Sequence, residues 1–580
     1  MKLDLSKNGH LSLTHLKLLN TIADEIKSSY MEMINQVGRG NEQNIDWWVS
    51  EIASRNTYTS RLYNDCCLLI FIKEVLKQEP GINEIIVGSL PLQKVLLQYV
   101  RKVYPDIRVT CKARWQSKIK FITYPVLRYF YSILLLVTRY LVGRYTIRHL
   151  AERLPPDCTL VDTFVFDHSF NGGVFHDRYY PGFLNYLSRE DKQSVYYNPT
   201  ILASYRNTIS VFLSMSRSRQ RFLPKEAFLK PSDYFFAFGY PFRAIKLHPK
   251  PTYWEGLDIT LLLRSIWYDH LTSFSSMEGL LKYRFARRLR EAGVSLRLVI
   301  DWFENQIIDK GANAGFRKFY PEVPIIGYSV NCSKYYLCMS HPTSEEYKAG
   351  VLPNVLAVCG KGFIYQRKVF CPELEVITTP AFRHAGVWKE ASTRPDPNHT
   401  TVLIALSLLV EECIISLRAC IDAVMLGLPP NVRFWVKPHP AAKSIEKLMV
   451  QDGITLPSNF TVIDGDFREW AEKADIIVGN ESSTVLEALA RGIPVIVIGN
   501  TSGITMHCVP DAVPLGLWQL CYTPSELAEA IKFFINRDDE DLQRHKKIAE
   551  TIREQYFEPV TQKGARKFLL LDGSTKVSLQ

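Results

Sequence analysis

The chain has 580 residues, of which 47% are hydrophobic and 22% are charged. It is too long for one ordinary core, and its composition excludes a disordered chain, a collagen and a polytopic membrane protein. The 12 cysteines include no CxxC pair and no ladder with histidines at zinc spacing, and the first ten residues lack the apolar core of a signal peptide. We therefore expect a reduced, cytoplasmic protein without structural zinc.

The first hundred residues predict an α/β arrangement. Most of this stretch has the mixed polar and apolar pattern of helices, and the run INEIIVGS at 82–89 predicts a strand. The segment LPLQKVLLQYVRKV at 90–103 follows it directly and predicts a helix. Strand followed by helix is the repeating unit of α/β proteins.

The net charge of +11 is concentrated between positions 107 and 150, a segment without Asp or Glu. Its nine basic residues are Arg108, Lys112, Arg114, Lys118, Lys120, Arg128, Arg139, Arg144 and Arg148. They flank the apolar run at 129–143 and do not alternate with aromatics along a groove, so we expect no nucleic-acid partner. The run is interrupted by Arg139 and is shorter than the roughly 20 residues that span a bilayer. It predicts an amphipathic helix on the membrane surface, with cations reaching anionic headgroups; the alternative is a core helix with arginines at its ends.

The next 240 residues predict further strands at 158–166, 232–240, 294–303, 322–330 and 354–360, with a helix at 280–293. We predict one N-terminal α/β domain over 1–387, with the basic segment at about 107–150 inserted in it. The polar stretch 388–400 contains two prolines and is typical of a linker.

From 401 to 540 strands and helices alternate cleanly, and 541–580 is predicted to be helical. This alternation predicts a parallel, doubly wound sheet whose ligand lies beyond the carboxyl ends of its strands.

Polar residues follow two of these strands directly. Lys437 and His439 lie in the loop after VRFWV, where a cation and an imidazole suit a phosphate. Ser482, Ser483 and Thr484 follow DIIVGN and open a helix, where hydroxyls and backbone N–H groups could face an anion. The alternatives are a simple helix cap and a loop histidine without a ligand.

Together, KPHP and the serine-bearing helix start before EALARGIPVIVIG resemble the C-terminal domain of GT-B glycosyltransferases of bacterial surface polysaccharides. They are similar above all to families with cytidine-nucleotide donors: bacterial sialyltransferases, Kdo transferases and CDP-glycerol glycerophosphotransferases. The resemblance implies two Rossmann-like domains with parallel sheets facing a central cleft. It implies nucleotide contacts for Lys437, His439 and the three hydroxyl residues, a place near the ribose for Glu487, and no metal or cofactor beyond the CMP-activated sugar.

The best candidates for catalysis follow the predicted strand at 294–303. Asp301 and Glu304 lie at its end, and Glu304, Asn305 and Gln306 form a triplet that resembles the Glu-Asn-Gln segment of a group of bacterial surface-carbohydrate biosynthesis proteins. Asp309 departs from that pattern. The resemblance favours Glu304 or Asp301 as the catalytic carboxylate and Asn305 and Gln306 as acceptor contacts; the alternative is that part of this set caps the following helix.

A second loop, at 167–183, follows the strand at 158–166. Asp167 and His168 begin it and could assist proton transfer. Asp177 and Arg178 lie beyond the pair Gly172 and Gly173, which permits a flexible loop, and are candidates for acceptor binding. The alternative is a solvated loop.

These observations predict a transferase at the inner face of the cell membrane that moves a Kdo-like or sialic-acid-like sugar from CMP to a polysaccharide, lipopolysaccharide or lipid-linked glycan. The alternatives are a CDP-glycerol or CDP-ribitol phosphotransferase, an isomerase of the nucleotide-sugar 2-epimerase kind, and an inactive scaffold of a polysaccharide assembly complex.

Overall fold

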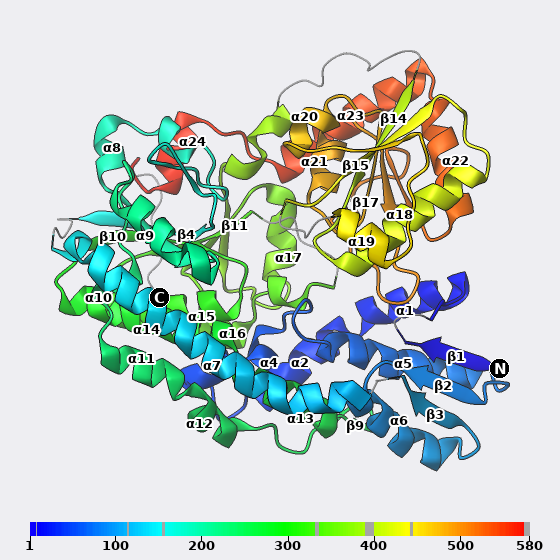
Figure 1. The fold of residues 1–580 in the computed structure, drawn as a ribbon, viewed down its shortest axis with the longest axis horizontal. Helices are drawn as coiled ribbons and strands as arrows, with labels where there is room; N and C mark the ends of the chain where they lie inside the picture. The colour runs from blue at the N-terminus through cyan, green and yellow to red at the C-terminus, as the bar shows by residue number, and fades with distance from the viewer. Residues whose placement is uncertain are drawn as a thin grey trace.

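The computed structural model describes residues 1–6, 9–112, 115–152, 157–330, 336–388, 399–440 and 445–572, without the side chains of 115–122 and 151. The linker predicted at 388–400 lies almost entirely outside them. In this part of the chain the strands form three parallel sheets and two short antiparallel pairs. Figure 1 shows three bodies: an N-terminal unit in blue, a middle domain in cyan and green, and a C-terminal domain in yellow and orange.

The N-terminal unit is built on a three-stranded sheet in the order β1-β2-β3. Its strands are β1 (Lys2–Leu5), β2 (Glu84–Val87) and β3 (Arg108–Cys111), and its helices are α1 (Leu13–Glu25), α2 (Lys27–Val37), α3 (Ile45–Trp48), α4 (Glu51–Ser54), α5 (Leu62–Gln78) and α6 (Leu90–Val103). The Oγ of Ser89 accepts from the N–H of Leu92 and caps α6. The strand and helix predicted at 82–103 are confirmed, and residues 1–112 have a sheet of their own.

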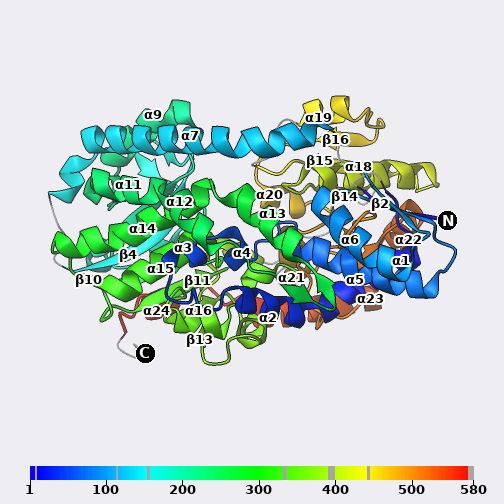
Figure 2. The same cartoon turned by 90° about the horizontal axis from the view of Figure 1, so that it is seen from below.

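Helix α7 (Trp115–Thr146) lies on the surface of the molecule along its length (Figure 2). Among the residues that the structure describes, it is the one helix that is long and apolar enough over 123–146 to cross a membrane. The apolar stretch is therefore longer than the sequence run suggested. Arg139 is 3% exposed and turned into the protein, so this arginine is not among the cations that could reach a membrane surface.

The middle domain has a six-stranded sheet in the order β13-β12-β11-β10-β4-β7. Its strands are β4 (Cys158–Val165), β7 (Val195–Ile201), β10 (Leu296–Trp302), β11 (Ile325–Ser329), β12 (Val355–Val358) and β13 (Glu375–Thr378). Its helices are α8 (Arg189–Gln193), α9 (Thr208–Ser216), α10 (Lys225–Phe228), α11 (Pro231–Phe238), α12 (Tyr240–Ala244), α13 (Thr260–His270), α14 (Phe274–Glu291), α15 (Ile307–Phe319), α16 (Ser344–Lys348) and α17 (Ile364–Lys368). Short pairs are β5 (Phe170–Asn171) with β6 (Val174–Phe175) and β8 (Tyr253–Trp254) with β9 (Leu257–Asp258).

Four of the five strands predicted in this region are confirmed, and the one at 232–240 is wrong. That segment forms α11, because Pro231 fits the first helical position and the Asp233 carboxylate accepts from the N–H of Lys230 at 2.8 Å. Its apolar residues Tyr234 and Ala237 are buried at helical spacing. Helices α14 and α15 pack backbone to backbone, since a Cβ on Gly311 would lie 2.1 Å from the carbonyl oxygen of Gly279.

The C-terminal domain has a six-stranded parallel sheet in the order β16-β15-β14-β17-β18-β19. The strands are β14 (Thr400–Ala405), β15 (Val432–Lys437), β16 (Phe460–Val462), β17 (Ile476–Gly479), β18 (Val495–Ile498) and β19 (Trp518–Cys521). The helices are α18 (Val410–Met425), α19 (Ile445–Gln451), α20 (Phe467–Ala471), α21 (Thr484–Ala490) and α22 (Pro524–Ile535). The predicted doubly wound sheet is confirmed.

The chain then returns to the middle domain through α23 (Asp539–Tyr556) and α24 (Gln562–Phe568). The N–H of Glu558 donates to the carbonyl of Cys359, and Arg297 donates to the carbonyl of Leu569. This return joins the two large domains at a second point besides the segment after β13. The result is a GT-B-like fold, with two Rossmann-like domains whose parallel sheets meet at a cleft.

Candidate active site

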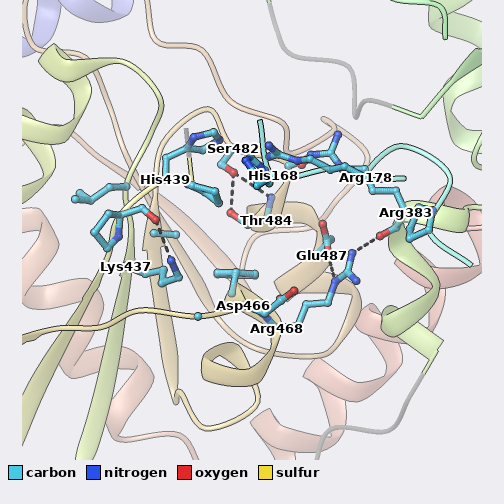
Figure 3. A pocket seen from close by; sticks show the side chains of 18 residues that line it. His168, Arg178, Arg383, Lys437, His439, Asp466, Arg468, Ser482, Thr484 and Glu487 are labelled. Carbon is cyan, nitrogen blue, oxygen red and sulfur yellow. Dashed lines mark hydrogen bonds and ion pairs between the residues drawn. The ribbon is translucent and has the colours of Figure 1, made fainter. Parts of the chain in front are cut away.

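A cavity of about 500 Å³ lies between the middle and C-terminal domains (Figure 3). Loops from both domains line it, and they follow the carboxyl ends of β4, β13, β15, β16 and β17. Its lining residues are His168, Arg178, Pro181, Arg383, Ala405, Leu406, Lys437, Pro438, His439, Pro440, Gly465, Asp466, Phe467, Arg468, Ser482, Ser483, Thr484 and Glu487. This is the position where parallel α/β sheets bind ligands.

The first loop of the C-terminal wall follows β15. Pro438 cannot donate to a strand ladder, so the strand ends at Lys437 and the chain turns toward the cavity. The ammonium of Lys437 is largely buried and donates to the carbonyl of Pro438 at 3.1 Å. His439 lines the cavity beside it (Figure 3). The sequence predicted both residues here, and the fold brings them together.

The second loop of this wall follows β17 and leads into α21. The hydroxyl of Thr484 donates to the Oγ of Ser482 at 2.9 Å, and the Ser482 Oγ also accepts from the N–H of Thr484 at 3.4 Å. Ser483 is the N-cap but makes no side-chain capping bond. All three hydroxyl residues line the cavity on its C-terminal side, as Lys437 does.

Glu487 lies one turn into α21 and belongs to an ionic cluster that joins the two domains. Its carboxylate lies 2.9 Å from the Nδ1 of His384 and 3.5 Å from the Nε of Arg468. Burial by itself would raise the pKa of Glu487, but His384, Arg468 and Arg383 together hold that pKa at about 2. A carboxylate held in this way is a weak base, and it holds Arg468 at the edge of the cavity.

The middle-domain wall is basic. His168 follows β4 and stacks on Phe166, with ring centroids 5.8 Å apart, and Arg178 lies beside it (Figure 3). Burial, and after it the positive charge of Arg383, lowers the pKa of Arg178. A guanidinium that is buried beside a second arginine in this way favours an anion next to it.

The loop that carries Arg178 is held by Asp177, which does not line the cavity. The Oδ1 of Asp177 accepts from the N–H groups of Tyr179 at 2.8 Å and Tyr180 at 3.2 Å, and from the Thr163 hydroxyl at 3.2 Å. Burial raises the pKa of Asp177 to about 6 despite these bonds. Asp177 therefore orders the loop from within, which differs from the predicted contact with an acceptor.

The rest of this loop is also ordered. Gly172 and Gly173 have φ of 56° and 75° and form the tight turn between β5 and β6, which requires positive φ at both positions. The expected flexible loop is therefore a short hairpin. Asp167 lies outside the cavity lining, and its Oδ1 accepts from the N–H of Ser204 at 3.0 Å.

The residues after β10 form a buried turn and not a wall of the cavity. Asp301 is 2% exposed, its Oδ2 accepts from Asn313 at 2.8 Å, and burial beside Asp309 and Asp162 raises its pKa well above the ordinary range. Asn305 is fully buried with a φ of 57° and donates to Glu346. A carboxyl that stays protonated and has no access to solvent is a poor general base.

Glu304 is less buried than Asp301 and Asn305. It accepts from the indole N–H of Trp302 at 3.1 Å and from the side chain of Gln306. Burial, and then the charge of Glu304, raises the pKa of Tyr179, the neighbour of Arg178, to about 12. Glu304 is thus close to Tyr179 without lining the cavity, and the Gln306 side chain donates to the Glu304 carboxylate.

Sequence reasoning missed Arg383, His384, Asp466 and Arg468. Their signal was positional: Arg383 follows β13, and Asp466 and Arg468 follow β16, so each comes just after a strand of a parallel sheet. Among the residues that the structure describes, no group of three or more His, Cys, Asp or Glu side chains could hold a metal ion.

No family model and no curated protein matches the chain. Solved structures similar to it include the S. aureus MnaA–UDP co-structure, at 13% identity over 73% of this chain and 99% of that chain, with a TM-score of 0.42. UDP-GlcNAc 2-epimerase from Neisseria meningitidis bound to UDP-GlcNAc is 13% identical over 72% of this chain and 100% of that chain, with a TM-score of 0.41. The calicheamicin glycosyltransferase CalG4 is 12% identical over 73% of this chain and 100% of that chain, with a TM-score of 0.38. At these identities and TM-scores the likeness assigns no activity and no ligand to this chain.

Proposed function

We propose that the protein is a glycosyltransferase that takes a CMP-activated 2-keto-3-deoxy sugar acid, Kdo-like or sialic-acid-like, and transfers it to a glycan or lipid-linked glycan. The observation that carries this proposal is the distribution of charge in the cavity. Lys437 and His439 lie on the C-terminal wall, and Arg178 and Arg383 lie on the opposite wall.

The C-terminal wall suits the nucleotide. Its loops follow the carboxyl ends of β15 and β17, which lie on either side of β14 in the sheet. Nucleotides bind at this edge in doubly wound folds. The ammonium of Lys437 and the imidazole of His439 supply charge to a phosphate, and the hydroxyls of Ser482 and Thr484 supply hydrogen bonds. The same groups would stabilise the negative charge that develops on CMP as it leaves.

The middle-domain wall distinguishes between donors. A sugar acid of the Kdo or sialic-acid type has a carboxylate on its anomeric carbon, whereas a UDP-hexose has no charge on its sugar. Arg178 makes no ion pair with any residue in the described part of the chain, and burial, followed by the charge of Arg383, lowers its pKa. A carboxylate between these guanidiniums would relieve their repulsion, so a donor with an acidic sugar matches both walls.

We assign the general base to His168, which lines the cavity, whereas Asp167, Asp301 and Glu304 do not. In the transfer, the acceptor hydroxyl attacks the anomeric carbon and a new C–O bond forms. The bond from that carbon to the CMP phosphate breaks, CMP leaves with the electron pair, and His168 takes the hydroxyl proton. This single displacement inverts the anomeric centre and needs no covalent intermediate.

The direct test is thermal unfolding of the purified protein with CMP, CDP, UDP, UMP or GDP. A ligand that binds the folded state raises the unfolding midpoint, so we expect CMP to give the largest rise and UDP little. A selective rise with UDP would instead favour an enzyme of the UDP-sugar 2-epimerase kind. A response to CDP-glycerol with no response to CMP-sugar acids would favour the phosphotransferase, and no response to any nucleotide would favour the scaffold.

A further inference from the structure

The outer face of α7 is an apolar stripe. Side chains at 124, 127, 131 and 134 recur at intervals of three or four along one side of the helix, with Phe130 beside them, and beyond Thr138 the side chains at 141 and 145 continue the same side. Leu127 is 67% exposed and Tyr145 is 92% exposed. From Tyr124 to Tyr145 the stripe is about 32 Å long at the α-helical rise. Exposed apolar surface of this extent marks a binding face.

Helix α9 and the loop before it widen this face. Helices α7 and α9 pack against each other, and both lie at the same surface of the molecule (Figure 2). The residues of this neighbouring segment that are exposed and apolar are Leu202, Tyr205 and Ile209. We call the stripe of α7 together with these three residues the α7/α9 face.

The inner side of α7 is fixed to the protein. Arg139 is buried and donates to the carbonyl of Ala203 at 3.2 Å, and Arg128 donates to Thr272 and to the carbonyl of Asp269. A Cβ on Gly143 would lie 2.6 Å from the Cβ of Glu226, so the helix backbone is in close contact with α10. These contacts hold α7 on the protein surface, although its length would allow it to cross a bilayer.

The charge at the α7/α9 face is positive. The chain has no Asp or Glu from 107 to 151, and Arg148 and Arg206 are exposed next to the apolar side chains. Aromatic side chains stand at both ends of the stripe, Tyr124 and Tyr145, and aromatic residues of this type favour the membrane–water interface. A long apolar strip on two helices that contain no Asp or Glu, with exposed arginines beside it, complements an anionic lipid surface.

We propose that the α7/α9 face binds the surface of an anionic phospholipid bilayer, with α7 parallel to the membrane plane. Leu127, Phe130 and Leu134 enter the acyl boundary, while Arg148 and Arg206 contact headgroups. Arg128 and Arg139 do not take part because they bind the protein itself. This binding depends on neither the donor nor the reaction, and a bound bilayer would bring a lipid-linked acceptor close to the enzyme.

The first test is flotation of the full chain with vesicles of phosphatidylglycerol and phosphatidylcholine. The double variant Leu127→Ser, Phe130→Ser should bind these vesicles at least about tenfold more weakly than the unmodified protein. The matched control is Tyr365→Ser, Leu515→Ser, which removes an aromatic and a leucine of 79% and 76% exposure outside α7 and α9. Equal binding by the two double variants would overturn the proposal, and so would an unmodified protein that fails to float at low salt.

A second measurement does not rely on the loss of binding. Tyr145→Trp should show strong additional fluorescence quenching by brominated lipid, and Leu515→Trp should show little. Arg148→Glu with Arg206→Glu should weaken binding to anionic vesicles and flatten its salt dependence. If light scattering showed a dimer that Leu127→Ser, Phe130→Ser converts to a monomer, the face would belong to a second copy of the chain and the proposal would fail.

Discussion

The two walls of the cavity are held in place by different means. The C-terminal wall consists of residues next to the ends of β15 and β17, and the bonds of Lys437 and of Ser482 stay within one or two positions. The middle-domain wall joins Arg178 and Arg383, which are far apart in the chain. One arginine depends on the buried Asp177, and the carbonyl of the other accepts from Arg468 of the opposite domain. The C-terminal wall is therefore determined by local sequence, whereas the middle-domain wall depends on the packed interior and on a contact between the two domains.

The largest expected effect comes from the group assigned to proton transfer. We expect His168→Ala to lower single-turnover transfer by about 10² to 10⁴, the usual contribution of a general base, with CMP affinity unchanged. Rapid-quench measurements with a CMP-sugar acid and a glycan acceptor would show this.

Asp301→Asn provides the contrast to that variant. Because the Asp301 carboxyl is buried and its pKa is raised, the amide replaces a group that is already protonated, and transfer should stay near the level of the unmodified protein. If Asp301→Asn abolished transfer and His168→Ala did not, the base would have to be sought behind the middle-domain wall, beginning with Glu304.

The C-terminal wall could be predicted from sequence because its determinants are local. Strand runs such as 434–436 and 476–479 have continuous apolar patterns, the prolines at 438 and 440 end the first strand, and parallel strands place their carboxyl ends at one edge. Once the βαβ alternation is recognised, Lys437, His439 and Ser482 must lie close together.

The middle-domain wall could not be predicted in the same way. Arg383 lies about 200 positions from Arg178, and nothing in the run AFRHAG distinguishes it from a surface loop. The acidic cluster at 301–309 pointed to chemistry, but the carboxyl groups of Asp301 and Asp309 accept hydrogen bonds from Asn313 and from the turn amides in the interior. Local pattern cannot distinguish a buried polar network from an active site, because the partners come from other elements.

The same limit applies to α7. The composition of 107–150 predicted an amphipathic helix, but it gave no means to tell Arg139, which is buried against the middle domain, from Arg148, which is exposed. That distinction depends on which side of the helix meets α9 and α10. A membrane test that substituted Arg128 because of its charge would lower the stability of the folded protein and not its affinity for lipid, because Arg128 donates to Thr272 and to the carbonyl of Asp269.

The next effect separates the two walls by ligand. Lys437→Ala should weaken CMP binding by about 2 kcal/mol, the range for a hydrogen bond to a charged group. Arg178→Ala should leave CMP binding unchanged and weaken binding of a CMP-sugar acid by a similar amount. Calorimetric titration of both variants with both ligands checks this. If the two variants lost equal binding free energy for CMP, the two walls would not bind separate parts of the donor.

The smallest expected effect is a difference in how the two walls respond to pH. The folded-state pKa of Asp177 is raised to about 6 by burial. The folded protein therefore holds a proton that the unfolded chain releases near pH 4, and stability falls as pH rises from 4 to 6. Asp177→Asn keeps an oxygen acceptor for the N–H groups of Tyr179 and Tyr180 and removes the buried charge. Relative to the unmodified protein, its free energy of unfolding should rise by about 2 kcal/mol between pH 4 and pH 7.

Glu487 should behave in the opposite way. Its folded-state pKa is held at about 2, so the stability it contributes is present above its ordinary pKa of 4.5 and is lost as pH falls toward 2. Glu487→Gln should therefore be less stable than the unmodified protein at pH 7, and the difference should shrink below pH 4.5. Calorimetric unfolding midpoints of the three proteins at pH 4, 5.5 and 7 measure both trends, because titrations common to all three cancel. If the difference in stability between a variant and the unmodified protein stayed constant with pH, the substituted carboxyl would have the same pKa in the folded and the unfolded chain. The contacts of that carboxyl would then not explain how its part of the site is held in place.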